Sequence, residues 1–171
     1  KSYIERNSAK GLQNTSILLI NHKTMEALAY LGSVDYFNSG IQGQVNGLLG
    51  KRSPGSTLKP IIYALALEQG IIHPESIIKD TPLRMTNYNP ENFEKDFLGP
   101  ISATEALIKS RNVPAIYLAN SIRNPSLYDF LKITGVKKLK EESFYGLALA
   151  LGGSELSMEE LLSLYAMLAN G

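Results

Sequence analysis

Hydrophobic residues near the start of the chain form two short runs separated by residues that favour a turn. The first run is Ser-Ile-Leu-Leu-Ile at 16–20, and Asn, His, Lys and Thr follow at 21–24. A second, partly alternating run covers 25–31 and stops at Gly32. This order predicts a β-hairpin. Residues 33–50 are rich in Gly, Asn and Ser and lack periodicity, which predicts a loop.

A helical stripe follows this loop. Between Ser56 and Gln69, apolar residues recur at the spacing of one helix face, and Gly70 suits the position just after a helix end. Pro60 lies near the expected first turn, where the loss of its N–H costs least. The stripe consists of Leu58, Ile61, Ile62, Leu65 and Ala66.

Prolines at 74, 82, 90 and 100 predict an irregular chain from 71 to 100. Helices resume at Ser102, which forms a capping-box sequence with Glu105. This helix should end near Ser110, and Pro114 fits the first turn of the next one. A further helix is expected from about 125 to 134, ending at Gly135.

The last expected helix follows a second capping box, Ser157 to Glu160, and ends at Gly171. Its apolar stripe, expected to be buried, is Leu161, Leu164, Tyr165 and Leu168. One hairpin with four or five helices predicts an α+β fold that is mostly helical.

Composition narrows the possible functions. With 171 residues, 44% of them hydrophobic, the chain can form one domain with a core. A net charge of +1 and the absence of basic clusters interleaved with aromatics argue against nucleic acid as a partner. The lack of cysteine excludes disulfides and thiolate chemistry, and no metal or nucleotide motif is present, so we expect no cofactor. Arg52, Arg84 and Arg111 could favour an anionic substrate, although arginines in water at the surface are commoner.

The two ends of the chain suggest that more sequence belongs to this protein. It starts at Lys1 rather than Met and stops at Gly171 directly after an expected helix. No apolar run approaches the roughly 20 residues that span a bilayer. We therefore expect a piece of a larger protein.

The first candidate for chemistry is Ser56-Thr57-Leu58-Lys59. On a helix, Ser56 and Lys59 share a face, and an amine beside a hydroxyl can make an activated serine nucleophile without histidine. Lys59 could take the proton if burial or a neighbouring cation favours its neutral form. The alternative is a capping serine followed by an ordinary surface lysine. The spacing alone decides nothing, because Ser76 and Lys79 share it.

The second candidate is Ser110-Arg111-Asn112, just before Pro114. A serine hydroxyl there can relay a proton, and an asparagine amide can bind a substrate backbone. The alternative is a turn between two helices, for which these residue types are well suited.

Taken in this order, the two motifs resemble the signature of the serine penicillin-recognising enzymes, Ser-x-x-Lys then Ser-x-Asn then Lys-Thr-Gly. The resemblance extends from about residue 15 to the end and is to the transpeptidase domain of class A (bifunctional) penicillin-binding proteins. Gly-Pro-Ile-Ser at 99–102 and Leu-Gly-Gly at 151–153 look most like the penicillin-binding protein 1C branch. The other segments that carry it are 27–33, 35–37, 52–60, 88–93 (Tyr-Asn-Pro-Glu-Asn-Phe), 106–107, 110–115 and 165–171.

This resemblance implies a β-lactamase/transpeptidase-like fold with the β-hairpin packed on helices. It also implies a D,D-transpeptidase that cross-links peptidoglycan. Ser56 would attack a stem peptide ending in D-Ala-D-Ala, Lys59 would be the base, Ser110 would shuttle the proton and Asn112 would hold the substrate. The implied partners are stem peptides and β-lactam antibiotics. The implied setting is a membrane-anchored protein outside the cytoplasm, in the periplasm or on the outer face of the membrane, with a glycosyltransferase domain.

One departure from the family matters. No Lys-Thr-Gly or Lys-Ser-Gly follows Ser110, and Lys23-Thr24 precedes the nucleophile and continues with Met25. We therefore expect residues 1–171 to be the N-terminal and central portion of the domain, truncated before the Lys-Thr-Gly strand, with little or no transpeptidase activity. An unpaired hairpin edge would also favour self-association.

Two other functions remain open. A β-lactamase needs a group that hydrolyses the acyl-enzyme, and Glu91 and Glu94 lie in a loop without a suitable context. A non-catalytic module that binds β-lactam or peptidoglycan as a sensor would not need the third motif.

Overall fold

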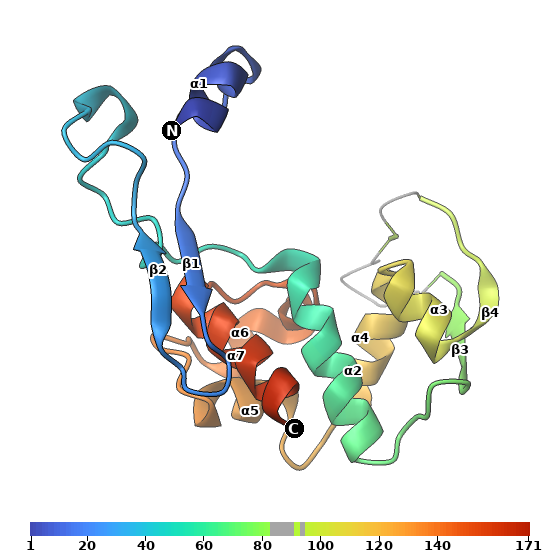
Figure 1. The fold of residues 1–171 in the computed structure, drawn as a ribbon. Coiled ribbons are helices and arrows are strands. Elements are labelled where there is room, and N and C mark those ends of the chain that lie inside the picture. Colours follow the sequence, from blue (N-terminus) through green and yellow to red (C-terminus); the bar gives the residue numbers. More distant parts are fainter. Residues whose placement is uncertain (83–90, 93–94) are drawn as a thin grey trace. The chain divides into compact units, whose positions relative to one another are not determined.

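The computed structural model describes residues 1–82, 91–92 and 95–171. The chain divides into two compact units, residues 1–52 with 156–171 and residues 53–155, which are described separately. The helices and strands are, in chain order, α1 (Ser2–Asn7), β1 (Ile17–Ile20), β2 (Ala27–Leu31), α2 (Lys59–Glu68), β3 (Ile77–Asp80), β4 (Gly99–Ser102), α3 (Ala103–Ile108), α4 (Asn112–Ser121), α5 (Leu127–Ile133), α6 (Glu142–Tyr145) and α7 (Met158–Asn170) (Figure 1).

The first unit contains the predicted hairpin. Strands β1 and β2 pair antiparallel, with Ile17 opposite Leu31, and the segment 21–26 connects them. The hairpin contacts α7 through polar groups, because Tyr30 Oη donates to Glu159 Oε1 at 2.9 Å. The predicted hairpin is therefore confirmed, and a second hydrogen bond to α7 runs from Asn170 Nδ2 to the His22 carbonyl oxygen at 2.7 Å.

Helix α7 begins as predicted but buries different residues. Ser157 Oγ accepts from Glu160 N at 3.2 Å and the Glu160 carboxylate accepts from Ser157 N at 2.8 Å, so the capping box is confirmed. Leu164 is buried, whereas Tyr165 and Leu168 are 38% and 43% exposed. The predicted buried stripe is therefore wrong for Tyr165 and Leu168, and Leu161 is only half-buried, because the buried face of α7 is the one that carries Leu164 and Ala166.

The core of the second unit is built on α2. All five residues of the predicted stripe are buried, at 0–3% exposure, and α2 packs on α4 (Figure 1). Pro60 occupies the first turn of α2, and Gly70 follows its end with a φ of 67°. Pro114 lies in the first turn of α4, as predicted.

A second two-stranded sheet lies where an irregular chain was expected. Strands β3 and β4 pair antiparallel, with Asp80 opposite Gly99 and the buried Ile78 opposite Ile101. The prediction is therefore wrong over these strands. Pro100 is compatible with the pairing because each strand of a two-stranded sheet is an edge, where a missing N–H is tolerated. Of the prolines behind that prediction, Pro90 lies outside the described residues.

Serine side chains cap the starts of α3 and α5. Ser102 Oγ accepts from Glu105 N at 3.1 Å, but the Glu105 carboxylate pairs with Lys109 at 2.8 Å. The reciprocal half of that predicted capping box is thus replaced by an ion pair one turn along the helix. Ser126 caps α5 by accepting from Asp129 N. Among the described ranges, no helix is both long and apolar enough to cross a bilayer.

Candidate active site

Ser56 lies in a tight turn that leads directly into α2. Residues Gly55–Leu58 form a 3₁₀ turn, and the N–H of Lys59 donates to the Ser56 carbonyl oxygen. Residues three apart in a 3₁₀ turn lie almost directly above one another, so the two side chains leave the backbone on the same side. The α-helix starts at Lys59 rather than at Ser56, so the shared face expected from the sequence would come from the 3₁₀ turn. Ser56 is exposed, whereas Lys59 is 1% exposed.

The loop before Ser56 is fixed from the far end of the same unit. Ser53 Oγ donates to the Gly152 carbonyl at 2.7 Å and accepts from Gly55 N at 3.2 Å. Gly55 has a φ of 53°, a left-handed backbone that glycine adopts without strain. The 151–153 segment, singled out only by resemblance, therefore supports the loop that presents Ser56.

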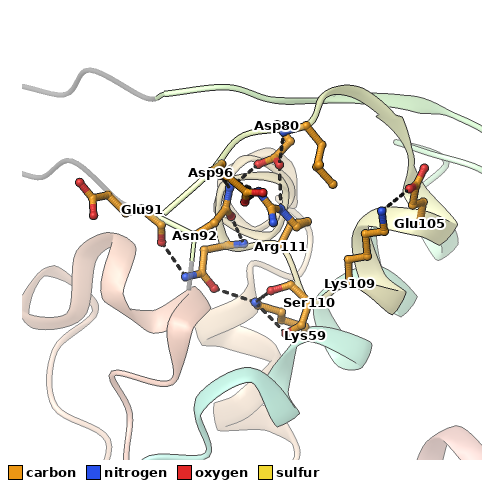
Figure 2. Close-up of polar contacts among 11 residues, drawn as sticks. Lys59, Asp80, Glu91, Asn92, Asp96, Glu105, Lys109, Ser110 and Arg111 are labelled. Carbon is orange, nitrogen blue, oxygen red and sulfur yellow. Dashed lines mark hydrogen bonds and ion pairs between the residues drawn. The ribbon is translucent and has the colours of Figure 1, made fainter. Parts of the chain in front are cut away.

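The amine of Lys59 joins the two sequence motifs. Its Nζ donates to the carbonyl oxygen of Ser110, to Ser110 Oγ at 3.1 Å and to Asn112 Oδ1 at 2.7 Å (Figure 2). A protonated lysine has three N–H donors, whereas a neutral one has two and a lone pair that the Ser110 hydroxyl can donate to, so these contacts suit either form of the amine. The structure thus brings together Lys59, Ser110 and Asn112. Ser56 lies one turn before Lys59 along the chain.

Ser110 has an unusual backbone. It connects α3 to α4 with a φ of 52°, in the left-handed region that disfavours residues with a Cβ. Such conformations persist only where surrounding contacts hold them, and they concentrate at functional sites. Here the conformation turns both oxygens of Ser110 toward the Lys59 amine.

Asn112 is the first residue of α4 and its side-chain amide is held at both ends. Oδ1 accepts from Lys59, and Nδ2 donates to the Glu91 carbonyl at 2.7 Å. Among the described residues only the Glu91 carbonyl accepts from this nitrogen, whose second hydrogen can serve another partner.

A buried charged network next to Asn112 was not predicted. Arg111 is 3% exposed, and its Nε donates to Asp80 Oδ2 at 2.7 Å. Burial opposes the charge of the guanidinium, but the hydrogen bonds that it donates to Asp96 and Asp80 outweigh burial and raise the pKa of Arg111. Asn92 is also buried and links to Asp80.

The surface reading of Arg111 is therefore wrong. Asp80 closes a strand that the sequence did not reveal, so nothing in the pattern pointed to it as a partner. Arg52 is exposed, and Arg84 lies outside the described residues.

The second Ser-x-x-Lys sequence has a different environment. Lys79 lies in β3 and is exposed, and Ser76 Oγ accepts from the N–H of His73 at 2.9 Å. Ser76 lies at the end of a turn just before β3, so Ser76 and Lys79 do not share a helical turn. The spacing shared with Ser56 and Lys59 does not produce a shared geometry.

The structure places a buried lysine beside two motif residues on an α+β framework, which is the arrangement expected of a penicillin-recognising fold. Comparison with known proteins identifies the family. A family model described as "Penicillin binding protein transpeptidase domain" matches residues 15–171. This chain therefore belongs to the family of penicillin-binding protein transpeptidase domains.

Individual relatives support the same assignment. Penicillin-binding protein 1C of Escherichia coli (strain K12) is 36% identical over 155 residues, which is 90% of this chain and 20% of that protein. Penicillin-binding protein 1F of Bacillus subtilis (strain 168) is 33% identical, over 85% of this chain and 20% of that protein. The expected likeness to class A proteins, and to the 1C branch, is confirmed. The chain spans about one-fifth of the length of these relatives.

Solved structures confirm the fold. Penicillin-binding protein 1A from Haemophilus influenzae superposes with a TM-score of 0.78 at 27% identity, over 92% of this chain and 24% of that one. The penicillin-binding protein PonA1 from Mycobacterium tuberculosis has a TM-score of 0.76 at 21% identity, over 99% of this chain and 47% of that one. The α+β penicillin-recognising fold expected from the sequence is thus confirmed.

Proposed function

We propose that residues 1–171 form the N-terminal and central portion of a serine D,D-transpeptidase domain, with Ser56 as its nucleophile. The proposal depends on the contacts of Lys59 Nζ with Ser110 Oγ and Asn112 Oδ1. Lys59 itself follows Ser56 by one turn of the chain. An ordinary surface lysine, the alternative considered from the sequence, would not be buried among these oxygens.

The proposed reaction begins at Ser56 Oγ, which attacks the carbonyl carbon of the penultimate D-Ala of a stem peptide. Its proton passes to Lys59 Nζ, and the amide bond to the terminal D-Ala breaks. Ser110 Oγ, which lies 3.1 Å from Lys59 Nζ, would then pass the proton to the departing amine. Asn112 binds the substrate backbone with the remaining donor of its amide.

The second half transfers the acyl group. The amine of a neighbouring stem peptide attacks the ester on Ser56, a new amide forms, and Ser56 recovers its proton. A β-lactam follows only the first half, because opening its strained ring leaves no departing amine and the ester persists. These steps form a peptidoglycan cross-link and make the site a penicillin target.

The printed sequence holds two of the family's three motifs. The third, a Lys-Thr-Gly strand, contributes one oxyanion-hole N–H, and the loss of one such donor costs about 10²–10³ in rate. We therefore propose that residues 1–171 alone are acylated slowly and transfer little or no acyl group. In a polypeptide that also carries that strand, the same residues would complete the site.

The setting follows from the proposed substrate. Stem peptides lie outside the cytoplasmic membrane, so the site would work in the periplasm or on the outer face of that membrane. A membrane anchor and a glycosyltransferase domain elsewhere in the same polypeptide would suit this role. The partners are then stem peptides and β-lactams.

Acyl-enzyme lifetime distinguishes the candidate functions. Residues 1–171 are exposed to a fluorescent penicillin, excess reagent is removed, and the labelled fraction is followed with time. A transpeptidase portion keeps the label for hours. Release within minutes would favour a β-lactamase, and reversible binding without a covalent label would favour a sensor module. Labelling as fast as that of a domain with all three motifs would contradict the incomplete site.

A further inference from the structure

We propose that Asp80 is a positioning residue that holds Ser110 and Asn112 in their working geometry through Arg111 and Asn92. This inference rests on the function proposed above. Asp80 lies at the end of β3, outside both sequence motifs, and is fully buried.

Each oxygen of the Asp80 carboxylate accepts hydrogen bonds from different residues. Oδ2 accepts from Arg111 Nε at 2.7 Å and from Leu98 N at 3.1 Å. Oδ1 accepts from Asn92 Nδ2 at 2.8 Å (Figure 2). The carboxylate therefore supports two separate arms that lead to the motif.

The first arm is the side chain of Arg111, the residue between Ser110 and Asn112. Its Nη2 also donates to the carbonyl and the carboxylate of Asp96, at 2.6 and 2.8 Å. A guanidinium held by charged hydrogen bonds in fixed directions restricts its own backbone. The backbone that it restricts is the one that places Ser110 and Asn112.

The second arm is Asn92. Its Nδ2 donates to Asp80 and to the Asp96 carbonyl at 2.9 Å, and its Oδ1 accepts from the backbone N–H of Asn112 at 2.8 Å. Asp80 thus reaches the first residue of α4 through one intervening side chain. Both arms end within one residue of the contacts made by the Lys59 amine.

The left-handed conformation of Ser110 explains why this anchoring matters. A residue with a Cβ does not prefer a φ of 52°, so contacts on both sides must hold it there. Lys59 holds Ser110 from α2, and the Asp80 network holds the adjacent Arg111 from β3. Without the carboxylate, Ser110 can relax, and its oxygens then move away from the Lys59 amine.

A buried ion pair alone is weak support for such a role, because its stability is often matched by apolar residues. The test therefore separates positioning from folding. Asp80→Asn keeps the shape and removes the charge. The matched control is Glu105→Gln, which removes the exposed ion pair to Lys109, the residue just before Ser110.

Two measurements are made on residues 1–171 at a temperature where circular dichroism shows each variant folded. The first is the rate at which a saturating penicillin acylates Ser56, followed by intact mass. We expect Asp80→Asn to slow it roughly 10- to 100-fold, as a small misplacement of a catalytic group does, and Glu105→Gln to leave it within about twofold. The second is hydrogen exchange of the Asn112 backbone amide, which we expect to quicken about tenfold in Asp80→Asn while interior amides of α2 keep their protection.

The outcomes are separable. Equal acylation rates in Asp80→Asn and the unaltered chain would overturn the inference and leave the proposed function standing. If Ser56 of the unaltered chain is never acylated, the proposed function fails, and exchange at Asn112 decides the inference alone. Unchanged exchange there, or an equal loss of protection throughout α2, would show that Asp80 does not position the motif.

Discussion

Gly152 lies so close to Gly55 that no side chain fits between them. A Cβ on Gly152 would stand 2.3 Å from Gly55 N and 2.6 Å from its Cα. Because Gly55 immediately precedes Ser56, this contact sets the position of the proposed nucleophile from a residue almost a hundred positions away.

The variant Gly152→Ala should therefore displace the Ser56 loop. It meets a steric clash and a φ of 84°, and we expect a loss of about 1–3 kcal/mol in the free energy of unfolding together with slower acylation of Ser56. Gly135→Ala is the matched control, since Gly135 has a φ of 88° with no atom within 4 Å of an added Cβ. Thermal unfolding and penicillin labelling measure both effects. Equal losses in the two variants would show that the contact with Gly55 is unimportant.

Because Lys59 is proposed as the base, we expect that no other cationic side chain can replace its amine. A guanidinium is larger, planar and does not give up its proton, so Lys59→Arg should lower the acylation rate by at least about 10²-fold. Lys79→Arg, at the exposed lysine of the other Ser-x-x-Lys sequence, should leave the rate unchanged. Acylation of Lys59→Arg at the unaltered rate would exclude Lys59 as the base.

Tyr63 gives a prediction about alkaline pH. It is 3% exposed, its hydroxyl has no hydrogen-bond partner among the described residues, and burial, with a smaller effect of the Asp80 charge, raises the pKa of Tyr63. Above the ordinary tyrosine pKa of about 10, the unfolded chain loses this proton while the folded chain keeps it, so stability falls as the pH rises.

Tyr63→Phe should remove that part of the alkaline loss. It should also leave stability at neutral pH equal or higher by about 1 kcal/mol, because an unpaired buried hydroxyl is removed. Urea unfolding at several pH values measures both, with the exposed Tyr117→Phe as control. A destabilised Tyr63→Phe at neutral pH would mean that the hydroxyl has a partner.

Hairpin edges predict self-association of residues 1–171. Strands β1 and β2 pair only with each other in the described structure, and their exposed side chains include Leu19 and Leu28 at 55% and 62%. We expect the mass from light scattering to rise with concentration, and Leu28→Lys to reduce the rise because a charge on an edge strand opposes pairing. Val45→Lys adds the same charge outside a strand. A monomeric mass at high concentration would contradict the prediction.

Much of the fold could be predicted because local signals agree with it. The α2 stripe, the glycine at its end and the Ser157 capping box depend on residues close in sequence. The β3–β4 pair could not be predicted, since its strands are four residues long, contain Pro100 and are paired across eighteen intervening positions. Local patterns carry no information about such a pairing.

The candidate site shows the same division. Ser56, Lys59, Ser110 and Asn112 were chosen from motif order, and the structure brings the last three into contact. Asp80 was missed because it meets the Arg111 side chain only through β3, a strand that the sequence pattern does not indicate. Conversely, spacing alone could not separate Ser56 from Ser76. The local structure separates them, because Ser56 lies in a 3₁₀ turn that continues into a helix and Ser76 lies just before a strand.

Mapping the site of penicillin attachment shows whether Ser56 is the acyl-accepting nucleophile. Residues 1–171 are exposed to penicillin for a prolonged period, digested and analysed by tandem mass spectrometry, alongside Ser56→Ala and Ser76→Ala. We expect one adduct, on Ser56, that is lost in Ser56→Ala and kept in Ser76→Ala. An adduct on any other residue, or a label that survives Ser56→Ala, would contradict it.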